Sequence, residues 1–189
     1  MASGKLIVLT GPSGVGKGTL VRTLLTRHPE LYLSVSATTR SPRSGEVDGK
    51  DYYFLTGAAF EKMIQQNELL EWAEYAGNYY GTPRAKVQEK IDQGIIVLLE
   101  IEVVGATAIK QTFPNALRIF VLPPSLAELE RRLRGRETDS EAAILRRIDR
   151  AKEELAVSKE FDKTIVNDDL EVALKQLESA VFSEPEFDS

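Results

Sequence analysis

Residue types that bind phosphate groups occur at suitable spacing in the run Gly11-Pro12-Ser13-Gly14-Val15-Gly16-Lys17-Gly18-Thr19. An apolar run, Leu6-Ile7-Val8-Leu9, precedes it, and the segment 20–25 that follows has apolar residues at helical spacing. A strand, a glycine-rich turn and a helix in this order form a phosphate-binding loop. Glycines let successive N–H groups point into one concavity, and the helix N-terminus adds partial positive charge. We therefore predict a nucleoside triphosphate site with Lys17 on the outer phosphates; a glycine-rich hairpin is the alternative.

The position after Lys17 departs from the usual form of this loop. Ser or Thr usually follows the lysine and contacts Mg²⁺, whereas here Gly18 follows and Thr19 comes one residue later. Mg²⁺ dehydrates reluctantly and often binds through substrate phosphates and water. We expect Mg²⁺ to be held mainly in that way, with Thr19 as a candidate protein ligand.

A second cluster of anion-binding residues lies in the segment 34–84. Arg40 and Arg43, separated by a Ser-Pro turn, can both fork onto one phosphate, and the hydroxyls of Tyr52 and Tyr80 can complete its shell. The same segment carries further polar candidates, Ser36, Glu71 and Thr82. On these residues alone, a solvated loop with surface arginines remains equally open.

The elements that must position these residues read as an α/β fold. A strand over 4–10, a helix over 17–27 and a strand over 31–36 make a βαβ unit, which predicts a parallel sheet with right-handed crossovers. Further strands are expected at 95–102, 117–122 and 161–167, and further helices at 83–93, 103–112 and 168–182. The predicted fold is a three-layer α/β domain with a central parallel sheet of about five strands.

Two insertions are expected on a core made of 1–33, 85–124 and 158–189. The segment 34–84 reads as a small mixed sheet with one helix over 57–66. The segment 125–157 reads as two helices, the first started by a capping box of Ser125 and Glu128. Because these helices are rich in charge and poor in any apolar stripe, we expect a mobile helical lid rather than part of the core. The whole chain, 1–189, is predicted to be one domain.

Composition excludes several classes of function. The 189 residues carry a net charge of −5 and no cysteine. The negative charge argues against nucleic-acid binding, and no apolar run approaches the roughly 20 residues of a membrane helix. With no signal peptide or disulfide expected, we predict a cytoplasmic protein without a membrane, nucleic-acid or obligate protein partner.

Three longer motifs resemble those of guanylate kinases. They are Ser36-Ala37-Thr38-Thr39-Arg40-Ser41-Pro42-Arg43 with Gly45-Glu46, then Gly77-Asn78-Tyr79-Tyr80-Gly81-Thr82, and finally Ile165-Val166-Asn167-Asp168-Asp169. The resemblance extends from the phosphate-binding loop to the last helix. It implies a P-loop kinase that transfers the γ-phosphoryl group of ATP to GMP, and to dGMP, with Mg²⁺.

The resemblance also implies roles for individual residues. In the GMP-binding insertion, the monophosphate would be held by Arg40, Arg43, Tyr52 and Tyr80, and the base would be bound by Glu71 with Ser36, Gly81, Thr82 and Glu100. The ATP site would comprise the loop residues 11–19 with Arg136 and Asn167. Lys17, Arg43, Arg136 and Arg147 would be catalytic, Arg147 also reaching GMP, although Arg132, Arg134 and Arg146 are neighbouring candidates. Most arginines of the cluster are expected to form helix-surface ion pairs.

One motif differs from the family pattern. Glu100-Ile101-Glu102 stands where relatives commonly have Asp-Ile-Asp, so each carboxylate lies one methylene further from the backbone. Glu100 is the candidate for base contact and Glu102 for Mg²⁺. Two other functions stay open: a protein-binding module on the same fold, and a P-loop kinase for another nucleotide or small molecule. Turnover on AMP or UMP equal to that on GMP would favour the second.

Overall fold

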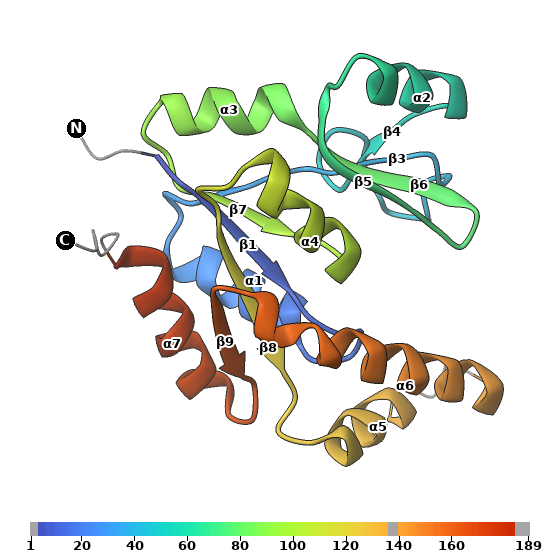
Figure 1. The fold of residues 1–189 in the computed structure, drawn as a ribbon, viewed down its shortest axis with the longest axis vertical. Helices are drawn as coiled ribbons and strands as arrows, with labels where there is room; N and C mark the ends of the chain where they lie inside the picture. Colours follow the sequence, from blue (N-terminus) through green and yellow to red (C-terminus); the bar gives the residue numbers. More distant parts are fainter. Residues whose placement is uncertain (1–3, 136–139, 184–189) are drawn as a thin grey trace. The chain divides into compact units, whose positions relative to one another are not determined.

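The computed structural model describes residues 4–135 and 140–183, and its strands form two sheets (Figure 1). The strands of the larger sheet are β1 (Leu6–Thr10), β2 (Tyr32–Leu33), β7 (Val97–Glu100), β8 (Leu117–Leu122) and β9 (Lys163–Val166). Their order is β2-β7-β1-β8-β9, and the pairs β2–β7 and β8–β9 are parallel. The predicted α/β class with a five-stranded parallel sheet is therefore confirmed.

The smaller sheet is mixed, as the sequence predicts for the insertion. Its strands are β3 (Ala37–Thr38), β4 (Tyr53–Phe54), β5 (Leu69–Tyr75) and β6 (Asn78–Pro83), in the order β4-β3-β6-β5. β3 pairs with β4 in parallel, whereas β6 pairs with both β3 and β5 in antiparallel fashion. Ala76 and Gly77 make the β5–β6 turn with φ values of 51° and 75°, conformations that suit a tight hairpin.

Side-chain caps explain where several helices begin. The helices are α1 (Lys17–Arg27), α2 (Gly57–Gln65), α3 (Arg84–Asp92), α4 (Val103–Thr112), α5 (Leu126–Arg134), α6 (Glu141–Ala156) and α7 (Leu170–Phe182), with a 3₁₀ turn at Ser158–Glu160. At α2, α5, α6 and α7 a side-chain oxygen of the preceding residue accepts a hydrogen bond from the third helical N–H: Thr56, Ser125, Ser140 and Asp169. No helix in the described ranges is long and apolar enough to cross a membrane.

The chain divides into two compact units. Unit 1 takes in the described residues up to Val8 together with Glu30–Ala116, and unit 2 takes in Leu9–Pro29 together with the described residues from Leu117 onward. The boundaries expected for the insertion, 34–84, and for the lid, 125–157, stay predictions.

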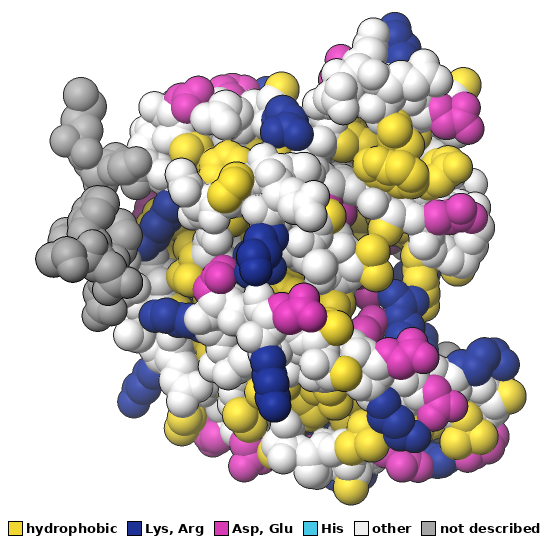
Figure 2. All heavy atoms as spheres, in the orientation of Figure 1, with side chains coloured by type: hydrophobic (Ala, Val, Ile, Leu, Met, Phe, Trp, Pro, Cys, Tyr) yellow, Lys and Arg dark blue, Asp and Glu magenta, His cyan; other side chains and the backbone are white. Residues whose placement is uncertain are grey.

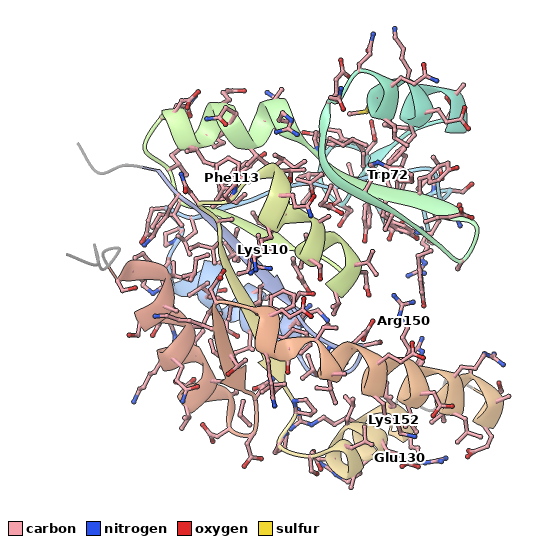
Figure 3. The ribbon with its side chains drawn as sticks, viewed as in Figure 1. Trp72, Lys110, Phe113, Glu130, Arg150 and Lys152 are labelled. Atoms are coloured by element: carbon pink, nitrogen blue, oxygen red, sulfur yellow. The ribbon has the colours of Figure 1, made fainter. Side chains whose placement is uncertain are left out.

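Unit 1 has an apolar cluster beneath its small sheet. Phe60 of α2 is fully buried and stacks on Tyr79 of β6 with ring centroids 5.4 Å apart. α4 packs against β5, and α3 packs against β7 (Figure 1). Hydrophobic side chains also gather on the surface over β5 and β6 (Figure 2). Trp72, labelled in Figure 3, is 45% exposed there and meets Tyr79 edge-on.

Unit 2 is held together by the packing of its first and last helices and by a buried arginine. α1 buries Leu20 and Leu24 and packs against α7, and Arg27 pairs with Glu171 at 2.8 Å. Arg118 of β8 is only 3% exposed, and its guanidinium lies over the Phe161 ring. It donates to the Glu160 carbonyl at 2.8 Å and to Asp162 at 3.3 Å, so it fixes the entry into β9.

The lid helices differ from the prediction that they lack an apolar stripe. Leu129 and Leu133 of α5 are buried, and α6 buries Ile144, Ile148 and Ala151. These residues recur every three or four positions, so α5 and α6 pack against each other along one stripe (Figure 1). The prediction was wrong because the many charges between them obscure the stripe.

Two other local predictions need correction. The strand expected over 31–36 is only two residues long, because β2 pairs with β7 of the large sheet at Tyr32 and Leu33, and the chain next forms a strand at β3, which belongs to the small sheet. The capping box is half formed: Ser125 accepts from the Glu128 N–H at 3.1 Å. The Glu128 carboxylate does not return to Ser125 but binds Arg131 and Arg132.

Candidate functional site

The predicted phosphate-binding loop in unit 2 connects β1 to α1. Gly16 caps α1 with φ 98°, a left-handed conformation that a side chain would strain. Its carbonyl accepts the N–H groups of Thr19 and Leu20, each at 3.2 Å. The Lys17 ammonium donates to the Gly11 carbonyl and, at 3.2 Å, to the Pro12 carbonyl. The cation therefore lies over the loop at the helix N-terminus, where phosphate oxygens bind in such loops.

Asn167 supports this loop from the end of β9. Its side chain is buried, and its amide donates to the Val15 carbonyl at 2.8 Å. A Cβ on Gly16 would lie 2.5 Å from the Asn167 amide nitrogen, so Gly16 is required for this approach. Arg132 of α5 donates to the Asn167 carbonyl at 3.0 Å and reaches the Val15 carbonyl at 3.4 Å. The predicted nucleotide residue Asn167 thus contacts the protein loop itself.

Most lid arginines form ion pairs on the helix surface, as expected. Arg131 and Arg132 share Glu128, which lowers the pKa of that carboxyl to about 2. Arg134 pairs with Glu130 and Glu141, whose hydrogen bonds raise its pKa further above the ordinary value. Basic and acidic side chains alternate over α5 and α6 (Figure 2). Figure 3 labels one charged residue of each helix, Glu130 of α5 and Arg150 of α6. Arg150 pairs with Glu154 at 2.9 Å.

Two of the predicted catalytic arginines belong to the segment 125–157. Arg136 lies outside the described residues. Arg147 is half-buried on α6, one residue before the buried Ile148.

The arginine–tyrosine cluster predicted in unit 1 forms around Arg40. Its guanidinium lies 5.4 Å from the Tyr52 ring centroid and donates to Glu46 at 2.9 Å. Hydrogen bonds with Glu46, and to a smaller degree with Tyr80, raise the pKa of Arg40. Tyr52 and Tyr80 meet edge-on with centroids 6.2 Å apart. Burial raises the pKa of Tyr52, so its hydroxyl stays a donor at neutral pH.

Glu46 joins the two predicted arginines. One carboxylate oxygen accepts from Arg40, and the other accepts from the backbone N–H of Arg43 at 2.7 Å. The Arg43 side chain itself is exposed. Glu46 was recognised only as part of a motif; its position three residues after Arg43 and six after Arg40 in a turn was the available clue.

A second group of predicted residues surrounds the carboxylate of Glu71 on β5. Glu71 is 8% exposed and accepts a hydrogen bond from the Thr82 hydroxyl at 2.6 Å. Burial raises the pKa of Glu71 to about 7, although hydrogen bonds from Thr82 oppose this effect. Gly81 lies behind it: a Cβ there would be 2.8 Å from the Glu71 carbonyl oxygen and 3.0 Å from the Phe60 ring. A desolvated carboxylate of this kind is typical of a binding or catalytic site.

The remaining predicted residues lie at the edges of unit 1. Ser36 precedes β3, and its carbonyl accepts from the Tyr53 N–H at 2.9 Å. Glu100 ends β7 and is exposed, and its charge contributes to the raised pKa of Tyr52. Sequence reasoning missed Gly105 of α4, which lies directly against the Glu71 carboxylate.

The candidate Mg²⁺ ligands offer few protein oxygens. Thr19 is exposed, and its hydroxyl accepts from Arg22 at 3.3 Å. Glu102 is exposed and precedes α4. Within the described residues, no three His, Asp or Glu side chains are grouped so that they could hold a metal. This donor set fits an ion that keeps its water and substrate ligands.

Unit 2 carries the phosphate-binding loop, and unit 1 carries a cationic cluster together with a buried carboxylate. These features define a nucleotide kinase of the P-loop class. The family model described as guanylate kinase matches residues 3–184. The chain belongs to the guanylate kinase family.

Individual relatives agree with this assignment. The chain is 63% identical over 180 residues to a guanylate kinase of Nostoc sp., covering 95% of this chain and 90% of the relative. It is 66% identical over 174 residues to a guanylate kinase of Synechocystis sp., covering 92% of this chain and 91% of the relative. Among solved structures, the crystal structure of guanylate kinase from Anaplasma phagocytophilum matches with a TM-score of 0.76 and 33% identity, over 95% of this chain and 85% of that chain.

Proposed function

We propose that the chain transfers the γ-phosphoryl group of ATP to GMP, and also to dGMP, yielding ADP and the nucleoside diphosphate. The observation that carries this proposal is the buried carboxylate of Glu71, held by Thr82 in the same unit as the Arg40–Tyr52–Tyr80 cluster. The Glu71 carboxylate suits the edge of a purine base, and the arginine–tyrosine cluster suits a phosphate.

Glu71 would read guanine through two hydrogen bonds. Its carboxylate can accept from the guanine N1–H and 2-amino groups, while the hydroxyls of Ser36 and Thr82 lie near the base and Glu100 gives a further base contact. Adenine has an acceptor at N1 and no 2-amino group, so the buried carboxylate would lose both bonds. A site of this kind can reject the wrong base by about 10⁴-fold.

The monophosphate would bind at the cluster around Arg40. Arg40 and Arg43 supply the cationic forks, and the hydroxyls of Tyr52 and Tyr80 donate to the remaining oxygens. The contact of Arg40 with Glu46 at 2.9 Å would orient the guanidinium before the substrate arrives. Gly81 has no side chain, so its strand, β6, would lie close to Glu71 beneath the base.

The triphosphate would bind at residues 11–19. Loop N–H groups and Lys17 would hold its phosphates, and Asn167 would keep the loop in shape. Phosphoryl transfer needs mainly positioning and charge neutralisation. By resemblance to the family, we assign the neutralising role to Arg43, Arg136 and Arg147, of which Arg147 also reaches GMP.

Mg²⁺ would accompany ATP, and the protein would add at most Thr19 and Glu102 to its ligands. When bound, the ion neutralises charge on the phosphate oxygens. We further propose that the protein works in the cytoplasm with ATP and GMP or dGMP as its only required partners.

The deciding experiment is a coupled ADP-release assay with ATP and Mg²⁺, offering GMP, dGMP, AMP, UMP and CMP separately. We expect turnover with GMP and dGMP alone, and its loss in Glu71→Ala. Equal turnover with AMP or UMP would favour a kinase for another nucleotide. Binding of GMP without any turnover would favour the protein-binding module.

A further inference from the structure

Gly105 is the third residue of α4 and lies against the carboxylate of Glu71. α4 packs against β5, the strand that carries Glu71 (Figure 1). A Cβ at Gly105 would lie 2.3 Å from the Glu71 Oε2 atom and 2.9 Å from its carboxyl carbon. Real Cβ atoms essentially never approach other heavy atoms this closely, so either the carboxylate or the helix would have to move.

Neither neighbour can move without cost. The other oxygen of Glu71 accepts the hydrogen bond from Thr82, whose side chain is fully buried. α4 is fixed by the buried residues Val103, Ala106 and Ile109 on its inner face. The φ angle of Gly105 is not in the positive range, and a glycine inside a helix costs about 1 kcal/mol relative to alanine. The backbone therefore gives no reason for a glycine here, whereas the Glu71 carboxylate does.

We propose that Gly105 is a positioning residue that determines specificity for guanine. The missing side chain leaves the space in which the Glu71 carboxylate lies, and so sets where its two oxygens meet the base. This inference rests on the proposed function, because it assumes that Glu71 binds guanine. A side chain at position 105 would turn the carboxylate away from the base while leaving the phosphate sites intact.

The test compares Gly105→Ala with Gly57→Ala in steady-state kinetics. Gly57, in the first turn of α2, has no atom within 4 Å of an added Cβ, so it is a matched control in the same unit. We expect Gly105→Ala to raise KM for GMP at least 10-fold, with kcat within about threefold and KM for ATP unchanged. Gly57→Ala should leave all three unchanged. An unchanged KM for GMP in a folded Gly105→Ala protein would overturn the proposal.

A compensating substitution separates positioning from damage to the fold. Glu71→Asp removes one methylene, which draws the carboxyl group back toward the present Cγ atom, 3.5 Å from the added Cβ. We expect the fold-increase in KM for GMP of Glu71→Asp/Gly105→Ala to be well below the product of the fold-increases of the two single variants. Strictly multiplicative effects would contradict the proposal. If Gly105→Ala does not fold, the double variant should fold again, and its failure to do so would also contradict it.

The wild-type protein distinguishes this inference from the proposed function. If wild type does not phosphorylate GMP, the proposed function fails and Glu71 has no guanine to bind. If wild type does so and Gly105→Ala is indistinguishable from it, only the inference fails.

Discussion

At the scale of the residue, we expect the Glu71 carboxyl group to prefer the neutral form in the free protein and the ionised form when GMP is bound. Without substrate, burial raises its pKa to about 7, so a large fraction is protonated near neutrality. Binding of guanine through two accepted hydrogen bonds requires the ionised form. In the free protein the Glu71 carboxyl group is therefore a desolvated acid, and binding of GMP would favour its ionisation.

We expect this acid to make the free energy of unfolding depend on pH. Its folded pKa lies above the ordinary value of 4.5, so the folded state holds the extra proton between about pH 4.5 and 7. Stability from this group is thus fully present below pH 4.5 and falls as pH rises to 7. The full loss is on the order of 3 kcal/mol, since each pKa unit is worth about 1.4 kcal/mol.

Urea unfolding of wild type and Glu71→Gln from pH 4 to 8 measures this effect. The neutral amide cannot ionise, so the variant should be the more stable protein at pH 8 and nearly equal to wild type at pH 4. A stability difference that does not change with pH would contradict the assignment. The same variant should bind GMP poorly at every pH.

Asn167 makes a second prediction at this scale. Asn167→Ala removes the donor to the Val15 carbonyl, which should loosen the phosphate-binding loop. We expect KM for ATP to rise about 10-fold, equivalent to about 1.4 kcal/mol, while GMP binding measured by calorimetry stays the same. An equal loss of GMP binding would indicate general damage to the fold.

At the scale of the element, the Arg118 contacts should dominate the stability of the β8–β9 pair. Removing a buried arginine leaves the Glu160 carbonyl without its donor and exposes the Phe161 ring. We expect Arg118→Ala to lower the free energy of unfolding by about 2–4 kcal/mol. Because Asp162 is half exposed, its charge can be solvated again, which keeps the cost below that of a fully buried pair.

Arg131→Ala is the matched control for this prediction. Arg131 pairs with Glu128 at 2.7 Å, closer than the 3.3 Å between Arg118 and Asp162, but its side chain is 76% exposed. Pairs of this kind contribute about 1 kcal/mol or less. Similar denaturation midpoints for the two variants would show that burial of Arg118 contributes little.

The sequence predicted the elements with strong local patterns and missed those that depend on distant partners. The limits of α1, α4 and β8 agree with the expected ranges, since apolar periodicity marks each of them. The early end of the strand expected over 31–36 depends on β7 and β6, the partners of β2 and β3, which come much later in the chain. The stripe on α5 and α6 was hidden among charges.

The same distinction holds for the candidate site. Arg40, Tyr52 and Tyr80 were predicted as a group, and the structure brings them together. Gly105 was not found, because a glycine in a helix has no local pattern that indicates a carboxylate from another strand. Arg132 was predicted only as a candidate catalytic arginine, whereas it contacts the carbonyls of Val15 and Asn167.

At the scale of the whole molecule, the residues proposed for the donor and acceptor sites belong to different compact units. Residues 11–19 lie in unit 2, and the Arg40 and Glu71 groups lie in unit 1. In-line transfer requires the reacting atoms to come within about 3–3.5 Å. We therefore expect the protein to become more compact when both nucleotides are bound, GMP closing 34–84 and ATP closing 125–157.

Small-angle scattering measures this change as a fall in the radius of gyration. GMP with a non-hydrolysable ATP analogue should give the smallest value, and each ligand alone an intermediate one. An unchanged radius with both ligands bound would contradict ligand-driven closure.

The interleaving of the two units in the sequence has a consequence for synthesis on the ribosome. The phosphate-binding loop and α1 are made among the first 29 residues, but their partners in unit 2 come only after residue 116. α1 stays without α7, and Val15 without Asn167, until those later residues have been made. The glycine-rich loop is thus made before its support, so a nascent chain stalled before Asn167 has the whole loop but not the side chain that holds it.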